Sequence, residues 1–457
     1  MFDDNKVIAA IATAQAAGGV GMIRVSGKGA MEICDKVFTA VSGNKLVSSK
    51  GYRAHFGRVY DSDGDIDECV ALVFKAPHSY TGEDVVELSC HGGLYVLKRT
   101  LRALLSAGAF PARAGEFTER AFLNGKMDLT QAEAVMNLIG AHGKQAADAA
   151  LTALDGTLSR KIEENTAKLV NICAHLSAWV DYPDEEIEEL ETSEMLATIE
   201  EVETSLNDLI DTYDNGKVLT QGVKTAIVGR PNVGKSTLMN MLVGSQKSIV
   251  TSYAGTTRDV VEETVVLGGI SLHLSDTAGI RESDDPIEAI GVNIAKDRLK
   301  KSEFVIAVFD GSENLTKEDE DVLEFCKDKL CLGVINKTDL DTKNIKDKIS
   351  AVIDTVVEIS AEKLDGKTDL EKAVQKLLET DRIDTTQAML TGERQYLSTA
   401  QALACVQEAK QALEMGLTLD AVNVSLDCAI ENLLELTGKK ASETVVNEIF
   451  SQFCVGK

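Results

Sequence analysis

The sequence lacks the features that mark membrane, fibrous and low-complexity proteins. Its 457 residues include only 5 prolines and 35 glycines, and 44% hydrophobic with 26% charged residues is ordinary globular usage. No run approaches the roughly 18 consecutive apolar residues of a membrane helix, so we expect no membrane contact. Two acids stand beside Lys6, where a secretory signal would be basic, so we expect the apolar stretch 7–23 to be folded chain.

Cysteine is sparse and shows no recurring spacing. The nine cysteines are an odd number, and no two of them form a C-x-x-C pair. This pattern argues against both a disulfide framework and a zinc ribbon. The cysteine content therefore predicts a reduced, cytoplasmic protein.

Positive charge is also scarce. Acidic residues outnumber Lys and Arg by 73 to 47, which gives a net charge of −26. A broad nucleic-acid-binding surface needs clustered cations that neutralise phosphates. We therefore expect any RNA contact to be local, or to be shared with a more basic partner.

Composition and hydrophobic periodicity divide the chain into four segments. Residues 1–118 mix strand-like and helical pieces and predict an α/β domain, whereas 119–218 is rich in Ala, Leu and Glu at helical spacing. Residues 219–378 alternate strands and helices, which predicts a mostly parallel sheet, and helical texture returns over 379–457. We interpret 219–378 as a domain inserted into a helical domain, although two separate helical domains would give the same pattern.

Periodicity places individual elements within the sheet-bearing segments. In the first segment we expect strands over 21–26, 52–60, 68–74 and 84–89, and helices over 29–38 and 94–107. In the inserted segment we expect strands over 223–228, 270–274, 304–309, 332–336 and 356–360.

A phosphate-binding loop is predicted at residues 229–236. Their sequence, GRPNVGKS, matches G-x-x-x-x-G-K-[ST] between an apolar strand and a helical run. Glycines let backbone N–H groups surround phosphate oxygens, and the helix N-terminus adds its dipole. Lys235 is expected to reach the β- and γ-phosphates and Ser236 to bind Mg²⁺. The expected nucleotide contacts are Asn232, Val233, Gly234, Lys235, Ser236 and Thr237.

Three further motifs follow in the order typical of a GTPase. Asp276 begins an Asp-Thr-Ala-Gly segment, and its carboxylate can reach Mg²⁺ through water. The carboxylate of Asp339 can accept hydrogen bonds from N1–H and the 2-amino group of guanine, which adenine lacks. The predicted substrate is therefore GTP. The expected contacts in these motifs are Asp276, Thr277, Ala278, Gly279, Asn336, Lys337, Asp339, Ser360 and Ala361.

A switch loop is predicted over 251–259, where Thr257 is the natural second hydroxyl ligand for Mg²⁺; a turn followed by a strand is the alternative. Ile280 stands where Ras-like GTPases place a glutamine that orients the attacking water. Catalysis must then find its positive charge and its water-positioning group elsewhere. The candidates are a bound monovalent cation, acting as a fixed positive charge, and a carboxylate within 281–288. The loop residues expected to contact GTP are Thr251, Ser252, Tyr253, Ala254, Gly255, Thr256 and Thr257.

Together with both ends of the chain, these motifs resemble the MnmE (TrmE) family of tRNA-modifying GTPases over the whole length. The GTPase motifs alone would also suit other bacterial GTPases, so the first and last segments single out this family. The resemblance rests on GGVGMIRVSG (18–27), TGEDVVE (81–87), HGG (91–93), GEFTERAFLNGK (115–126) and FCVGK (453–457).

The resemblance implies an N-terminal folate-binding and dimerisation domain, a helical domain and an inserted Ras-like GTPase domain. It places the family's potassium site on Asn232, Thr251, Tyr253 and Thr256, and its catalytic carboxylate on Glu288. The alternative for Glu288 is an exposed helix residue.

The same resemblance implies a site for 5-formyl- or methylene-tetrahydrofolate. It places this site on Arg24, Glu87, Lys126 and Lys457, with Cys454 as a candidate reactive thiol. Serving one folate requires the C-terminal tail to pack against the N-terminal domain. The alternatives are a surface role for Arg24, an exposed Glu87–Lys126 ion pair, and a small hydrophobic role for Cys454.

The function implied is K⁺-stimulated, dimerisation-dependent GTP hydrolysis coupled to adding a carboxymethylaminomethyl or aminomethyl group to C5 of the wobble uridine of certain tRNAs. The implied partners are a second copy, tRNA, and an MnmG (GidA)-type protein that binds FAD and NADH in a heterotetramer. One alternative is a ribosome-assembly-type GTPase switch without modification chemistry, which usually carries a basic RNA module or a second GTPase domain. Another, a folate-binding regulator with a vestigial GTPase, conflicts with the intact motifs.

Overall fold

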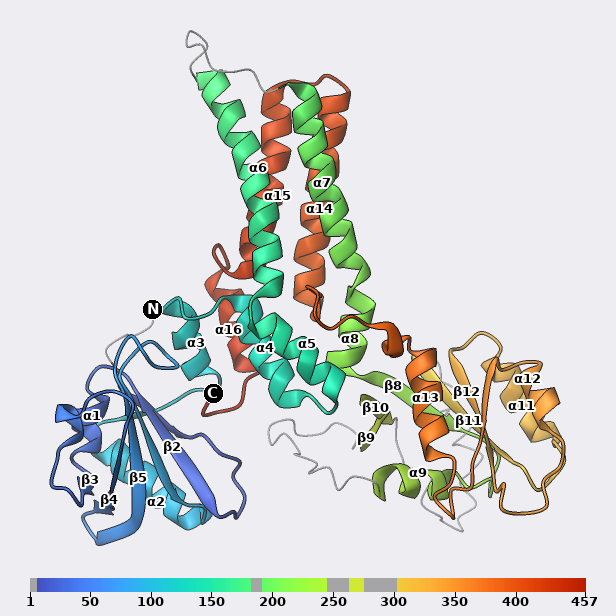
Figure 1. Ribbon diagram of the computed structural model, residues 1–457, viewed down its shortest axis with the longest axis horizontal. Coiled ribbons are helices and arrows are strands. Elements are labelled where there is room, and N and C mark those ends of the chain that lie inside the picture. Colours follow the sequence, from blue (N-terminus) through green and yellow to red (C-terminus); the bar gives the residue numbers. More distant parts are fainter. Residues whose placement is uncertain (1–5, 182–190, 245–262, 275–301) are drawn as a thin grey trace. The chain divides into compact units, whose positions relative to one another are not determined.

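The computed structural model describes residues 6–181, 191–244, 263–274 and 302–457 (Figure 1). Contacts divide the chain into two compact units. The first comprises Met1–Met136, Ser159–Val202 and Gln401–Lys457, and the second comprises Asn137–Leu158 and Glu203–Ala400. Among the described helices, none combines the length and the apolar composition that crossing a membrane requires.

The first unit contains a sheet with seven described strands in the order β3-β4-β5-β6-β2-β1-β7. Neighbouring strands are antiparallel, except that β1 and β7 are parallel. The strands are β1 Ile8–Ile11, β2 Val20–Ser26, β3 Phe38–Ala40, β4 Arg53–Asp61, β5 Gly64–Phe74, β6 Val85–His91 and β7 Phe110–Pro111.

Helices α1 (Ala30–Cys34) and α2 (Leu94–Ser106) accompany this sheet. Ile23, Leu88 and Leu104 belong to their shared apolar core. The four strands predicted for this segment are confirmed. The helix predicted over 29–38 is shorter than expected, because the chain from Phe38 onward pairs with β4 as strand β3.

Long helices make up the rest of the first unit and continue into the second. They bury leucine, isoleucine and valine stripes, such as Leu169 with Ile172 and Leu426 with Leu433. Figure 1 shows α6, α7, α14 and α15 running side by side. The helices are α3 Glu116–Leu123, α4 Leu129–Gly140, α6 Thr157–Asp181, α7 Thr192–Asp211, α14 Glu393–Glu414, α15 Leu419–Thr437 and α16 Glu443–Ser451.

A disulfide joins Cys405 of α14 to Cys428 of α15, with the two Cα atoms 6.1 Å apart. The sequence argued against a disulfide framework, and the structure pairs only these two of the nine cysteines and leaves the other seven free. Consecutive helices bring this one pair together over 23 residues, which neither the cysteine count nor the cysteine spacing indicates.

The second unit contains a sheet with six described strands in the order β13-β12-β11-β8-β10-β9. All neighbouring pairs are parallel except β9 with β10. The mostly parallel sheet predicted for this segment is therefore present. The strands are β8 Val223–Val228, β9 Glu263–Leu267, β10 Ile270–Leu274, β11 Phe304–Asp310, β12 Cys331–Asn336 and β13 Thr355–Glu358.

Strand β11 shows why this sheet needs helices on both faces. Every residue from Phe304 to Asp310 is buried. Successive side chains point to opposite faces, so Phe304 and Ile306 join one apolar cluster while Val305 and Phe309 join another. The helices of this unit are α5 Lys144–Leu154, α8 Tyr213–Gln221, α9 Lys235–Gly244, α11 Lys317–Cys326, α12 Lys346–Ser350 and α13 Lys367–Leu377.

Candidate functional site

The predicted phosphate loop connects β8 to α9, and its two glycines are required by close backbone contacts. Gly229 and Gly234 have φ angles of 152° and 95°. A Cβ on Gly229 would lie 2.4 Å from the carbonyl oxygen of Val308, and one on Gly234 would lie 2.2 Å from Nδ2 of Asn336. Only glycine fits both positions, so the pattern G-x-x-x-x-G is needed for the loop to form.

The side chain of the loop lysine folds back onto the backbone of the loop. Lys235 begins α9, and its Nζ donates to the carbonyl oxygens of Gly229 and Arg230 at 2.7 and 2.8 Å. The N-terminus of α9 adds positive dipole at the same place. Lys235 and Ser236 therefore occupy the end of the helix where phosphate and Mg²⁺ chemistry would use them.

Asn336 connects the phosphate loop to the loop that follows β13. Its Nδ2 donates to the carbonyl oxygen of Val233 at 2.9 Å, and its Oδ1 accepts from the backbone N–H of Ala361 at 3.0 Å. The Asn336 residue is only 2% exposed. Two segments predicted to contact the nucleotide are thus joined through one buried amide.

Asp339 has the charge state that guanine recognition needs. Its Oδ1 accepts from the hydroxyl of Ser360 at 2.7 Å, and this hydrogen bond holds the pKa of Asp339 below its usual range. The ammonium of Lys363 lies 3.7 Å from the other oxygen and acts in the same direction. An ionised carboxylate of this kind can accept two N–H groups from one ligand edge.

Lys337 is fixed by a contact that the sequence did not predict. It adopts a φ of 64°, and its Nζ lies 2.6 Å from Oδ2 of the buried Asp310 at the end of β11. Burial would raise the pKa of Asp310, but hydrogen bonds from Lys337 and Ser312 outweigh it and lower that pKa. The only signal in the sequence was an aspartate at the carboxyl end of a parallel strand.

The remaining predicted nucleotide-site residues lie outside the described residues, and their roles remain predictions. They are Thr251, Ser252, Tyr253, Ala254, Gly255, Thr256, Thr257, Asp276, Thr277, Ala278, Gly279 and Glu288. Of the four predicted K⁺ ligands, the structure therefore describes only Asn232, which has a φ of 63° in the phosphate loop.

The C-terminal tail lies against the N-terminal segment, as predicted. Val455 forms an antiparallel bridge with Ala114. The backbone N–H of Gly115 donates to the carbonyl oxygen of Cys454 at 3.4 Å, and that of Phe117 donates to Lys457 at 3.2 Å. The helix α16 that precedes the tail packs on α3 through Phe450 and Phe122. The C-terminal tail is thus packed against the N-terminal domain.

Three of the four predicted folate residues come together at this junction. Arg24 on β2 is directly opposite Glu87 on β6, and two of its nitrogens lie 2.9 Å from Oε1 of Glu87. Arg24 also donates to the carbonyl oxygen of Gly456 at 3.4 Å. Burial and the charge of Arg24 lower the pKa of Lys457, while Glu87 and Cys454 oppose this shift. Lys457 is therefore electrostatically coupled to the pair.

Lys126 is placed differently. Its Nζ donates to the carbonyl oxygen of Pro77 at 3.2 Å, and it makes no described contact with Arg24, Glu87 or Lys457. The alternative of an exposed Glu87–Lys126 ion pair is wrong, because Glu87 pairs with Arg24. A surface role for Arg24 is also wrong, since this residue is only 9% exposed.

Two aromatic residues beside Arg24 were not singled out from the sequence. The rings of Tyr80 and Phe117 lie 5.2 and 5.6 Å from the Arg24 guanidinium carbon. Burial raises the pKa of Tyr80, whose hydroxyl hydrogen-bonds to Thr118. Both aromatics stand in or beside segments that carry the family resemblance, which was the available signal.

The same region also contains an ionic network that is largely buried except at Arg113. Arg120 on α3 bonds the carboxylates of Glu83 and Glu116 at 3.0–3.1 Å, and Arg113 lies 2.9 Å from Glu119. Burial raises the pKa of Glu119. This network fixes α3 and the chain before it, which carry the backbone N–H groups that bond the C-terminal tail.

The phosphate loop, the Asn336–Asp339 segment and the mostly parallel sheet define the class of a P-loop GTPase. A family model described as "MnmE helical domain" matches residues 129–454, and one described as "GTP-binding protein TrmE N-terminus" matches residues 7–126. The chain belongs to the MnmE (TrmE) family of tRNA modification GTPases.

Relatives match the chain from end to end. The "tRNA modification GTPase MnmE" of Alkaliphilus metalliredigens is 40% identical over 462 residues, and that of Clostridioides difficile is 38% identical over 460 residues. Each alignment covers 100% of both chains. The FeoB G domain of Methanococcus jannaschii aligns with 34% of this chain and 97% of its own length at 25% identity, with a TM-score of only 0.26.

Proposed function

We propose that this chain hydrolyses GTP while adding a carboxymethylaminomethyl or aminomethyl group to C5 of the wobble uridine of certain tRNAs. The observation that carries the proposal is the meeting of Arg24, Glu87 and Lys457 at the junction of the two chain ends. A GTPase switch has no need for such a site, whereas a modification enzyme needs a place for a one-carbon donor.

The residues at this junction suit a folate. Glu87 uses Oε1 for Arg24, and its Oε2 has no partner among the described residues, so this oxygen can accept N–H groups of a pterin. The ammonium groups of Lys457 and Lys126 offer positive charge to an anionic glutamate tail. Bound 5-formyl- or methylene-tetrahydrofolate would supply the one-carbon unit. Tyr80 and Phe117 keep the neighbouring guanidinium partly shielded from water.

Hydrolysis is assigned to the inserted domain. Ser236 and Thr257 supply hydroxyl oxygens, which suit Mg²⁺ as a hard cation. Asn232, with Thr251, Tyr253 and Thr256, is proposed to hold K⁺ as a fixed positive charge beside the phosphates. Glu288 is proposed to orient the attacking water, because Ile280 has no polar group for this role.

The proposed assembly follows the family. It consists of a homodimer joined through the N-terminal domain and an MnmG (GidA)-type partner that supplies FAD and NADH chemistry in the cytoplasm. The proposed domain boundaries are 1–118, 119–218, 219–378 and 379–457. The alternative of a ribosome-assembly-type switch is favoured by no described feature of the chain.

Nucleoside analysis of tRNA tests this function. A strain that lacks the gene should lose the modified wobble uridines, and expression of the wild-type chain should restore them. Two results would contradict the proposal. One is that wobble uridines stay unmodified even when the wild-type chain is expressed, and the other is that the deletion strain keeps its full set of modified uridines. A ribosome-assembly defect with normal tRNA nucleosides would favour the alternative instead.

A further inference from the structure

The N-terminal segment differs in charge from the rest of the chain. Residues 1–118 contain 13 Lys and Arg and 13 Asp and Glu, so this segment is neutral. The whole net charge of −26 therefore belongs to residues 119–457. A polyanion that approaches the protein is repelled least at the N-terminal sheet domain.

Helix α2 carries three of the thirteen Lys and Arg residues of this domain, Lys98, Arg99 and Arg102. Its sequence, LYVLKRTLRALLS, contains no aspartate or glutamate. Lys98 and Arg102 are exposed and stand one helical turn apart, where like charges repel each other. Neither side chain forms an ion pair or a hydrogen bond with any residue that the structure describes. Among the residues that the structure describes, both charges are therefore left open to a ligand.

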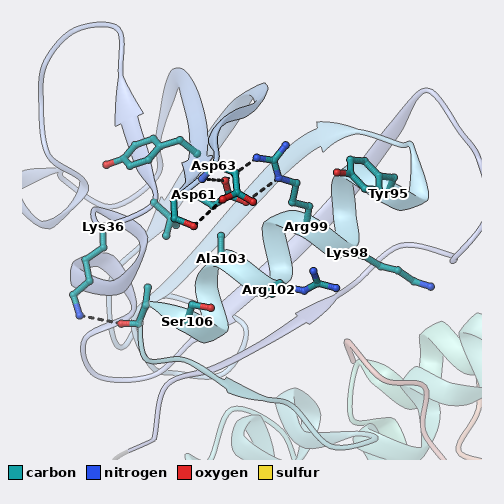
Figure 2. Close-up of a pocket in the computed structure, with 13 residues that line it drawn as sticks. Lys36, Asp61, Asp63, Tyr95, Lys98, Arg99, Arg102, Ala103 and Ser106 are labelled. Carbon is teal, nitrogen blue, oxygen red and sulfur yellow. Dashed lines mark hydrogen bonds and ion pairs between the residues drawn. The ribbon is translucent and has the colours of Figure 1, made fainter.

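A cleft of about 670 Å³ lies between α2 and the turn that joins β4 to β5. Arg99 crosses this cleft and binds both oxygens of Asp61 at 2.8 and 2.7 Å (Figure 2). These hydrogen bonds lower the pKa of Asp61, so the acid stays ionised and its charge is balanced by Arg99. Lys36, on the opposite wall, uses one N–H for the carbonyl oxygen of Ala107 at 3.0 Å. Two further N–H groups of this ammonium remain for a ligand.

Tyr95 adds an aromatic surface to the same helix face. It stands one turn before Lys98 and Arg99, and it is 75% exposed. Figure 2 shows its ring at the end of the cleft near Arg99, while Lys98 and Arg102 extend outward from α2, away from Asp61. Surfaces that bind single-stranded nucleic acid combine exposed aromatic rings, on which bases stack, with cations that follow the backbone.

We propose that Tyr95, Lys98 and Arg102, with Lys36 across the cleft, bind a single-stranded or loop segment of tRNA by its phosphates and one stacked base. This inference rests on the proposed function for the identity of the RNA. Lys98 and Arg102 stand one helical turn apart on the exposed side of α2, and Lys36 lies on the other wall of the cleft. That arrangement fits an extended chain of phosphates better than a single free phosphate, and the exposed ring fits a base better than an acidic protein surface.

The test is tRNA binding by the full-length protein, measured by fluorescence anisotropy over a series of salt concentrations. Lys98→Ala/Arg102→Ala should weaken binding roughly tenfold at low salt and reduce the slope of log K against log salt by about 1.4, which is about 0.7 for each phosphate that the variant no longer neutralises. Alanine favours helix at both exposed positions, so the melting temperature should not fall. Tyr95→Ala should weaken binding, and Tyr95→Phe should bind as the wild type does.

The matched control is Lys28→Ala/Lys50→Ala, which removes the same charge from exposed positions of the same domain that do not line the cleft. The inference would be overturned if the α2 double variant bound tRNA with the same affinity and salt dependence as this control. Tight binding of uridine monophosphate at the cleft, with unchanged tRNA affinity in the variants, would also overturn it and indicate a small-anion site. The wild-type chain's ability to restore modified uridines in the deletion strain tests the proposed function separately, whatever the variants bind.

Discussion

Replacing Gly456 with alanine tests whether the docked C-terminal tail forms part of the folate site. Gly456 has a φ of 99°, a backbone conformation that costs an alanine about 1–2 kcal/mol. The new Cβ would also lie 2.4 Å from the carbonyl oxygen of Ile11. Because this obstacle is backbone, it cannot rotate away. The tail must shift or detach.

The strain energy of an alanine at this position is comparable to the stabilisation that the tail gains from its hydrogen bonds. Three hydrogen bonds of 3.2–3.4 Å attach the tail, from Gly115, Phe117 and Arg24. Hydrogen bonds of this kind contribute about 0.5–1.5 kcal/mol each, so together the three supply roughly 1.5–4.5 kcal/mol. We therefore expect Gly456→Ala to displace the tail in a large fraction of molecules and to weaken 5-formyl-tetrahydrofolate binding at least about tenfold, which is about 1.4 kcal/mol.

Isothermal titration with 5-formyl-tetrahydrofolate measures the affinity, and amide exchange at Gly115 and Phe117 reports whether the tail is docked. The control is Gly416→Ala. Gly416 has a φ of 68°, but an alanine Cβ at this position would meet no atom within 4 Å, so the variant carries the backbone strain without the clash. Faster exchange with wild-type folate affinity would refute the shared site. Unchanged exchange would refute the steric argument itself.

Three further predictions concern the inserted GTPase domain. Hydrolysis should require K⁺ and hardly respond to Na⁺, and Asn232→Ala should remove the difference between the two salts; equal rates of the wild type in both salts would contradict the proposed cation site. Glu288→Ala should lower the turnover number roughly 10²–10⁴-fold with little change in GTP affinity, because an orienting carboxylate acts mainly in the transition state; an unchanged turnover number would support an exposed helix residue instead. Asp339→Asn should weaken GTP binding and favour xanthosine triphosphate, since the amide can donate to a 2-oxo group; nucleotide titration measures both, and retained guanine preference would argue against the assigned contact.

The GTP site was largely predictable because its determinants are local in sequence. The phosphate loop follows a strand and precedes a helix within about twenty residues, and its glycines are required by contacts of the loop with the next strands. Asn336 and Asp339 follow a buried strand in the same way. The Lys337–Asp310 contact was missed because β11 and β12 are neighbours only in the folded sheet.

The junction of the chain ends depends on long-range packing. Arg24 and Gly456 are separated by 432 residues, and no periodicity connects them. The resemblance placed Arg24, Glu87 and Lys457 in one site, but residue patterns alone did not. Strands β1 and β7 were not predicted either, since β7 has two residues and both depend on pairing partners far along the chain. The Cys405–Cys428 pair depends on the packing of two consecutive helices, which cysteine spacing does not reveal.

The most direct test of the central claim removes Cys454–Lys457 and measures two activities. The claim predicts that a strain expressing only the truncated chain lacks modified wobble uridines in its tRNA, while the purified truncated protein hydrolyses GTP as the full-length protein does. Hydrolysis should survive because no predicted residue of the phosphate, Mg²⁺ or guanine sites lies beyond Ala361. Normal modified uridines in that strain would show that the tail is only a terminal segment and would contradict the claim.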